Sequence, residues 1–482
     1  MNFFRRLLII LCCLLCCTPT YAAREGQTDP GATQLREPIG AVYSLSATVD
    51  TAMRNYPTLR RARARLGQSG AEVSLARTAY LPSLDVLAQE VRTTTNNVAG
   101  TIFPQPLNVI PTQTGPANDT SSFKSVFANN YGTNFSWMLY DWGQRHSSVV
   151  VARDQVAQAN ENIKLTELDV AAAAAGAYLA NVETKVTIKA QQATVDRMQA
   201  WDLVVHTLVD KGLRAGVDAA RADADLSNAK ILLIESERAA QLAGVDLAET
   251  MGLAGVQVAI DDTPWTKRPI EKTPFKGFNP EMHPLALLRS AEVDTAHAQI
   301  IAVEKSYRPR LWFHSGIWSR GSGSRIDAHP VADGILPQNA NYVVGFGIDF
   351  PILNYYPIKA KERGARQNEI AEHANYDLAI QEITRNNARA RVLLDNARRL
   401  ANETPVLITA AKDNETKAFE RYRVGLSNIL EVAEAQRILQ NALVQDGVAQ
   451  VRIWRSILAA AYANGDLRPF LELAKQAEAT SK

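Results

Sequence analysis

Two parts of the chain alternate apolar and other residues with the two-residue period of a β-strand. The clearer case is the set Tyr342, Val344, Phe346, Ile348 and Phe350, which share one parity. A weaker case is the set Phe127, Tyr131, Phe135, Trp137 and Leu139. Such alternation is typical of barrel strands with one lipid face and one lumen face. The pattern predicts strands over 127–140 and 341–353, with partner strands over 83–94 and 310–319. From these strands alone, a soluble hairpin domain remains open.

The chain also repeats itself. Pro57 and Pro82 bracket a helical stretch, and Pro284 and Pro309 bracket another at an offset of 227 residues. Proline suits the first turn of a helix and prevents its continuation at the other end. Later landmarks repeat at an offset of 213: Leu139-Tyr140-Asp141 with Ile352-Leu353-Asn354, and Gly212 with Gly425. The smaller offset predicts a shorter loop between the strands of the second repeat, because length changes concentrate in exposed loops.

Long helices occupy the rest of each repeat, over 143–256 and 358–466. The stretch from Gly143 to Gly212 lacks proline and would form about 100 Å of continuous helix. A coiled-coil seam with 3-4-3-4 spacing follows the second glycine and comprises Ile429, Val432, Gln436, Leu439 and Leu443. Such lengths predict a bundle or tube, with a kink near Pro405.

These patterns divide the chain. A first repeat covers 45–256 and a second covers 281–466, joined by a linker over 257–280. Loops rich in Gly, Asn, Pro and Thr are expected near 95–125 and 320–340. A polar lead-in covers 24–44, and a tail covers 467–482.

Residues 1–23 have the pattern of a secretory signal peptide. Arg5 and Arg6 precede an apolar run over 7–17, and small residues follow for cleavage after Ala22 or Ala23. All four cysteines lie in this run, so the mature chain would contain neither disulfides nor a cysteine nucleophile. A lipid anchor at Cys16 remains an alternative, although Leu15 before it disfavours that modification.

The mature chain would carry 50 basic and 50 acidic residues once Arg5 and Arg6 are removed. This balance gives no reason to expect nucleic acid as a partner. No later apolar run approaches 18 residues, so entry into a membrane would require strands.

Catalytic signatures are missing from the sequence. It contains neither a Gly-x-Ser-x-Gly elbow nor a phosphate-binding Gly-Lys-Ser/Thr loop. No two of the seven histidines have metal-ligand spacing on one helix face. We therefore expect no enzyme activity, no cofactor and no metal site.

The order and duplication of these features resemble the TolC family of outer-membrane channels over roughly residues 45–470. The strongest local similarities are Leu139-Tyr140-Asp141-Trp142-Gly143 and Tyr422-Arg423-Val424-Gly425-Leu426, followed by Ile429-Leu430-Glu431-Val432. The resemblance implies a homotrimer whose subunits each give four strands to one shared 12-stranded β-barrel in outer-membrane lipid. The long helices would continue the barrel as a coiled-coil tunnel in the periplasm.

The resemblance also implies partners and a gate. The partners would be a periplasmic adaptor (membrane fusion) protein and an inner-membrane pump, either proton-driven or of the ABC type. The helix-turn tips would lie at Gly212 and Gly425, and the residues of the periplasmic gate would be Asp218, Tyr422, Glu431 and Glu434. Asp218 and Tyr422 match a pair that bonds across neighbouring helices.

Glu431 and Glu434 share one helix face, because they are three residues apart. In a trimer they would form two rings of carboxylates that attract cations and raise each other's pKa. Ser427 departs from the family pattern, which has a basic residue there, and Arg214 is a candidate substitute. A solvated helix face remains the alternative for the two glutamates.

Two other functions compete with the channel. A secreted coiled-coil structural protein would share the long helices but would not need alternating aromatic strands in both repeats. A periplasmic adaptor would have one helical hairpin, whereas here two complete units repeat. The cargo stays open among drugs, metals, polysaccharide and protein, as does the type of pump.

Overall fold

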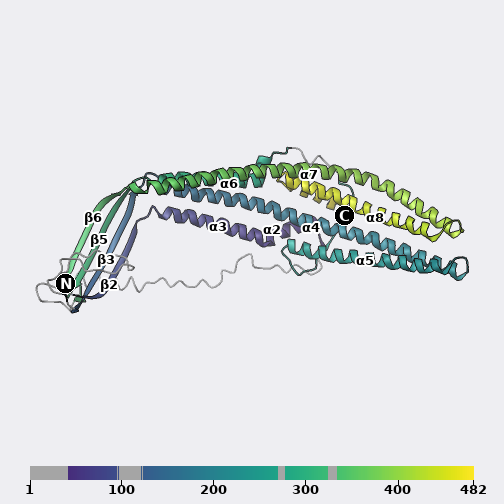
Figure 1. Cartoon of the computed structure of the whole chain (residues 1–482), viewed down its shortest axis with the longest axis horizontal. Coiled ribbons are helices and arrows are strands. Elements are labelled where there is room, and N and C mark those ends of the chain that lie inside the picture. Colours follow the sequence, from purple (N-terminus) through teal and green to yellow (C-terminus); the bar gives the residue numbers. More distant parts are fainter. Residues whose placement is uncertain are drawn as a thin grey trace.

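The chain forms an elongated molecule with a β-sheet at one end and helical hairpins at the other (Figure 1). The computed structural model describes residues 42–94, 96, 121, 123–269, 277–323 and 334–481. The expected signal peptide, most of the lead-in and much of both strand-connecting loops lie outside the described residues. No helix within the described residues is both long enough and apolar enough to cross a bilayer.

The sheet contains the four expected strands in the order β2-β3-β5-β6, all antiparallel. They span Ser83–Thr94 (β2), Ser125–Tyr140 (β3), Arg310–Ser322 (β5) and Asn339–Asp349 (β6). β6 ends at Asp349, earlier than the predicted 353. Pro351 cannot donate a ladder hydrogen bond, and a 3₁₀ turn (η4, Ile352–Asn354) follows it.

The two faces of this sheet differ in polarity. The strand register places a set of apolar, exposed side chains on one face: Leu84, Val86, Trp137, Ile317, Tyr342, Val344, Phe346 and Ile348. The other face carries polar side chains: Asp85, Gln89, Asn130, Asn134, Ser136, His314, Arg320 and Asn341. The structure therefore places the predicted alternation of β6 on a sheet whose apolar face no other described element covers.

Equivalent helices of the two repeats agree in length and position. α3 (Pro57–Thr78) and α6 (Pro284–Lys305) have 22 residues each and begin at the two predicted prolines. α5 (Gly216–Thr250) and α8 (Ile429–Ala463) have 35 residues each. The offsets of 227 and 213 residues read from the sequence therefore relate elements of the fold, and the two repeats are structural.

Two helices run nearly the full length of the helical part. α4 (Gln144–Asp210) has 67 residues and α7 (Tyr355–Arg423) has 69 residues, which corresponds to about 100 Å each. α4 folds back into α5, and α7 folds back into α8 (Figure 1). Pro405 lies inside α7 without ending it.

An aromatic core forms part-way along the helices and includes the segment expected to be a linker. Trp265, in the 3₁₀ helix η1 (Thr263–Thr266), is fully buried. Its ring packs edge-on against the rings of Tyr178 in α4 and Trp454 in α8. The distances between ring centres are 5.7 Å and 4.9 Å, respectively. Through Trp265, the described part of this segment thus contributes to the core. Its strand β4 (Ala259–Ile260) pairs in parallel with β1 (Val42–Tyr43).

The expected C-terminal tail is also structured. It forms α9 (Arg468–Ser481), whose Phe470 is buried against Trp454. Glu478 of α9 accepts a 2.8 Å hydrogen bond from the backbone N–H of Leu45, the first residue of α2 (Leu45–Asn55). This contact satisfies an unpaired donor at the start of α2 and joins the two ends of the described chain.

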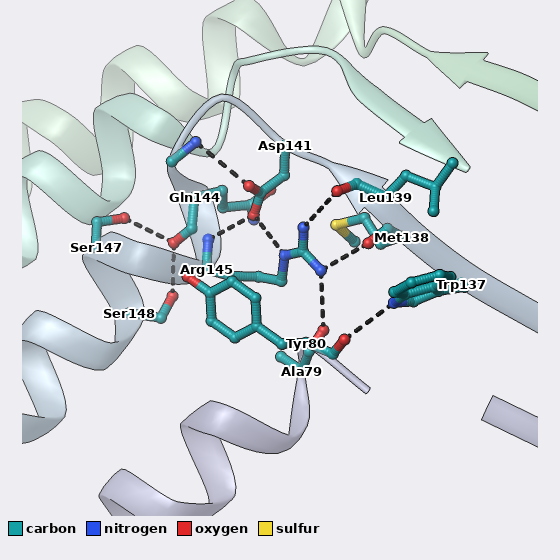
Figure 2. A network of polar contacts seen from close by, with 11 residues as sticks. Ala79, Tyr80, Trp137, Met138, Leu139, Asp141, Gln144, Arg145, Ser147 and Ser148 are labelled. Carbon is teal, nitrogen blue, oxygen red and sulfur yellow. Dashed lines mark hydrogen bonds and ion pairs between the residues drawn. The ribbon is translucent and has the colours of Figure 1, made fainter. Parts of the chain in front are cut away.

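A buried ion pair fixes the junction between β3 and α4 (Figure 2). Asp141 Oδ2 accepts hydrogen bonds from the backbone N–H of Arg145 at 2.6 Å and from its Nε at 3.1 Å. The Arg145 guanidinium also donates to the carbonyl oxygen of Met138 at 2.7 Å and covers the ring of Tyr80. Gly143 between them has a φ of 92°, which favours glycine. These contacts explain the chemistry of the Asp141-Trp142-Gly143 motif.

The second repeat lacks this pair. The positions equivalent to Asp141 and Arg145 at the offset of 213 are Asn354 and Ile358. The nearby charges instead lie on the helices, where Glu362 of α7 binds Lys359 and Arg366. The two junctions of the repeats therefore differ in chemistry although their helices are equivalent.

Candidate gate at the hairpin tips

Each helical hairpin turns at a glycine in the left-handed region. Gly212 has a φ of 71° and Gly425 has a φ of 83°. At each tip the residue after the glycine bonds back to the preceding helix: Leu213 N–H to the Leu208 carbonyl at 2.9 Å, and Leu426 N–H to the Arg421 carbonyl at 2.8 Å. This pattern is the Schellman motif, which satisfies the last carbonyl groups of a helix. Each glycine therefore lies at the turn of its hairpin.

A hydrogen bond connects the two hairpins just behind these turns. Tyr422, near the end of α7, donates from Oη to Asp218 Oδ2 at 2.9 Å. Asp218 lies in the first turn of α5, where the helix dipole favours a negative charge. Burial and then the Asp218 carboxylate raise the pKa of Tyr422 to about 12, so its hydroxyl stays protonated as a donor at physiological pH.

Arg214 makes a second contact between the same two hairpins. Its guanidinium carbon lies 4.2 Å above the centre of the Tyr422 ring, and its Nη2 donates to the Tyr422 carbonyl oxygen. The structure thus brings the candidate substitute from the first tip onto the second tip. Ser427, at the position where the family pattern has a basic residue, has a buried hydroxyl oxygen without a hydrogen-bond partner.

Apolar packing surrounds this polar contact. The Tyr422 side chain is fully buried, and its ring packs edge-on against Trp201 of α4 at 5.0 Å. Trp201 also meets Phe419 at 5.3 Å. Val205 and Val432 belong to the same cluster and are fully buried. We call this group the tip cluster, and it orients Tyr422 toward Asp218.

The two glutamates lie on the exposed side of α8, close to its start. Asn428 caps this helix by accepting from the Glu431 N–H at 3.1 Å. The Glu431 carboxylate lies 3.6 Å from Nε of Arg421 on α7. Glu434 accepts two hydrogen bonds from Arg437, at 2.8 Å and 2.5 Å. Both glutamate side chains are about half exposed in the single subunit.

Within one subunit, the pKa of Glu434 shifts in the direction opposite to the rise expected for stacked carboxylate rings. The hydrogen bonds from Arg437 hold the pKa of Glu434 below its ordinary value. The arginine one turn later is visible in the sequence, and an i, i+3 pair of this kind could have been anticipated. The role of Trp201 could not, because it depends on how the two hairpins meet.

The first repeat matches the family model described as outer membrane efflux protein over residues 48–253. The first repeat is therefore similar to this family. Among curated proteins, CyaE of Bordetella pertussis is 21% identical over 428 residues, covering 88% of this chain and 84% of CyaE.

Solved structures of outer-membrane channels share the fold. The Campylobacter jejuni CmeC outer membrane channel is similar with a TM-score of 0.69 and 15% identity over 94% of each chain. The open state of the Neisseria gonorrhoeae MtrE outer membrane channel has a TM-score of 0.66 and 17% identity, covering 88% of this chain and 89% of MtrE. The chain therefore has the fold of these outer-membrane channels.

Proposed function

We propose that three copies of this chain form the passive exit duct of a tripartite efflux pump or of a type I secretion system. The observation that carries the proposal is the open four-stranded sheet. Its edge strands β2 and β6 have no further partner among the described strands, and one face is apolar and exposed. Lipid does not tolerate open strand edges, and three such sheets joined edge to edge close a 12-stranded barrel.

The long helices would continue this barrel as a tunnel. The length of about 100 Å for α4 and α7 suits a conduit across the periplasm. The polar sheet face, with Asn134, His314 and Asn341, supports a hydrated lumen that passes solute without holding it. The chain carries no nucleotide-binding motif, so energy would come from a periplasmic adaptor and an inner-membrane pump, either proton-driven or of the ABC type.

The hairpin tips would form the gate at the periplasmic end. The Tyr422–Asp218 hydrogen bond and the Arg214 contact each join the first hairpin to the second, so opening the tips apart would break both. Glu431 and Glu434 would face the axis of the trimer as two rings of carboxylates and would favour cations. Their exposure in the single subunit supports a position facing solvent.

The experiment combines mass with conductance. The purified protein in detergent is expected to have three times the mass of one mature chain by light scattering after subtraction of the detergent, and to give stepwise single-channel currents in planar bilayers. A folded monomer in lipid, or a trimer without channel activity, would contradict the proposal.

Matched arginine substitutions in β6 test the two sheet faces. Phe346→Arg puts a charge on the apolar face and is expected to cost about 2–4 kcal/mol near the middle of a bilayer, which reduces trimer yield. Asn341→Arg puts the same charge on the polar face of the same strand and is expected to preserve the trimer while changing ion selectivity. Equal loss of trimer in both variants would argue against a lipid face and a lumen face.

A further inference from the structure

Three side chains from two helices converge near the tip cluster. Asp202 and His206 lie one turn apart on α4, and Asp223 faces them from α5. One ligand atom from each residue lies within 4.8 Å of the other two. Carboxylate oxygen and imidazole nitrogen are ligands that bind divalent transition metals.

The distances from the imidazole fit a hydrogen bond to Asp223 and are also compatible with a cation shared by the three side chains. His206 Nε2 lies 3.2 Å from Asp223 Oδ1 and 3.7 Å from Asp202 Oδ1. A proton on Nε2 can therefore bond to Asp223, but the second distance is too long for a hydrogen bond. Two ligands at the usual zinc distances are separated by about 3.4 Å in a tetrahedron, and the observed distances lie on either side of this value.

An unsatisfied oxygen gives independent support. Asp202 Oδ1 is buried and accepts no hydrogen bond in the described structure. Neither Asp202 nor Asp223 pairs with a lysine or arginine within the described ranges, so the imidazole is the one basic group facing two carboxylates there. A buried carboxylate oxygen without a donor is costly, and a cation between the three side chains would satisfy it.

The site is held in place by buried neighbouring residues and is accessible to solvent. Trp201, Val205 and Ala222 are sequence neighbours of the three side chains, and all are buried in the tip cluster, which holds α4 against α5 at this level. The His206 side chain is 41% exposed and that of Asp223 is 60% exposed, so solvent reaches the site and water can complete the coordination.

We propose that Asp202, His206 and Asp223 bind one divalent transition-metal cation, with Zn²⁺ as the representative ion, and that the cation crosslinks α4 to α5 beside the tip cluster. Histidine spacing along the sequence does not reveal this site, because only one of its ligands is a histidine and one comes from the next helix. The binding proposal stands independently of the proposed gate.

The test is calorimetric titration of the full-length protein in detergent with Zn²⁺, with Mg²⁺ as a second titrant and without a histidine tag. We expect one Zn²⁺ per chain and little Mg²⁺ binding, since Mg²⁺ prefers oxygen ligands in an octahedron. His206→Gln is expected to weaken Zn²⁺ binding at least about tenfold. Asp223→Asn should act in the same direction and, because its side chain is mostly exposed, should leave the fold intact.

His297 provides the matched control. It forms a cross-helix pair with Glu369 at 2.8 Å, but within the described part of the chain no third ligand joins them. His297→Gln should keep wild-type Zn²⁺ binding. As a second measurement, Zn²⁺ should raise the melting temperature of the wild type and of His297→Gln but not that of His206→Gln. Absence of Zn²⁺ binding in the wild type, or equal binding in wild type and His206→Gln, would overturn the proposal, as would equal loss in His297→Gln.

Discussion

Replacing Tyr422 with phenylalanine isolates the contact that would hold the gate closed. The phenyl ring keeps its packing against Trp201, and only the hydroxyl that donates to Asp218 at 2.9 Å is lost. A hydrogen bond to a charged group contributes about 1.5–3 kcal/mol, and the lower value applies because water can reach half-buried Asp218. If three subunits open together, the loss is about 4.5 kcal/mol, which shifts the closed–open equilibrium about two-thousandfold.

The assay is single-channel recording in planar bilayers. Tyr422→Phe and Asp218→Ala should each raise the open fraction, and the double variant should resemble either single variant because all three remove the same bond. Effects that add in the double variant would show that the two residues act separately. Wild-type conductance in both single variants would refute the reasoning.

Tyr462 offers a control with the same chemistry. Its hydroxyl donates to Asp169 of α4 at 2.8 Å, at the end of α8 that lies away from the tip. Tyr462→Phe removes an equivalent bond about 50 Å from the turn, because α8 has 35 residues. It should lower the melting temperature without opening the channel. An equal rise in conductance would mean that general loosening, and not the tip contact, controls the channel.

Further predictions concern the carboxylates and the packing of the helices. Replacing Glu431 and Glu434 together with alanine should reduce cation selectivity and block by multivalent cations, measured as reversal potential and current; unchanged values would assign both residues to a solvated face. Arg437→Gln should raise the pKa of Glu434, because the hydrogen bonds that lower it are lost, so on acidification block should disappear at a higher pH than in the wild type. Gly447→Ala should lower the melting temperature by overpacking against α4, at a cost of about 1–3 kcal/mol. Gly364→Ala, with open space around its Cβ in the subunit, should be neutral or stabilising by up to about 1 kcal/mol.

Much of the fold was predictable because the main helices and strands occur in both sequence repeats. The prolines at 57 and 284 begin helices of equal length, and the glycines at 212 and 425 end helices with the same hydrogen-bond pattern. The bounds of β2 agree with the predicted strand over 83–94. Local propensity and repeat spacing reinforce each other at these positions, so the prediction did not depend on long-range contacts.

The segments outside the repeat were harder to predict. Trp265 lies in a short 3₁₀ helix without apolar periodicity, and its burial depends on Tyr178 and Trp454, which are far away in the sequence. α9 is a single helix with no counterpart in the first repeat, and its docking is determined by Phe470 and Glu478. Contacts between residues distant in the sequence therefore determine both the burial of Trp265 and the docking of α9.

The candidate gate was also predictable only in part. The resemblance pointed to Asp218 and Tyr422, and the structure brings these two side chains into hydrogen-bond contact. The Arg437 pairing was available from spacing alone. The convergence of Asp202 and Asp223 on His206 was not, since it requires the register of α4 against α5.

The unpaired edges of β2 and β6 also affect how a subunit behaves before it assembles. A lone subunit exposes backbone donors and acceptors along two strands, together with aromatic and aliphatic side chains such as Phe346 and Ile348. Such edges are templates for incorrect pairing with other chains. A subunit that has not yet assembled is therefore exposed to aggregation, and overproduction should yield aggregates instead of stable free monomers.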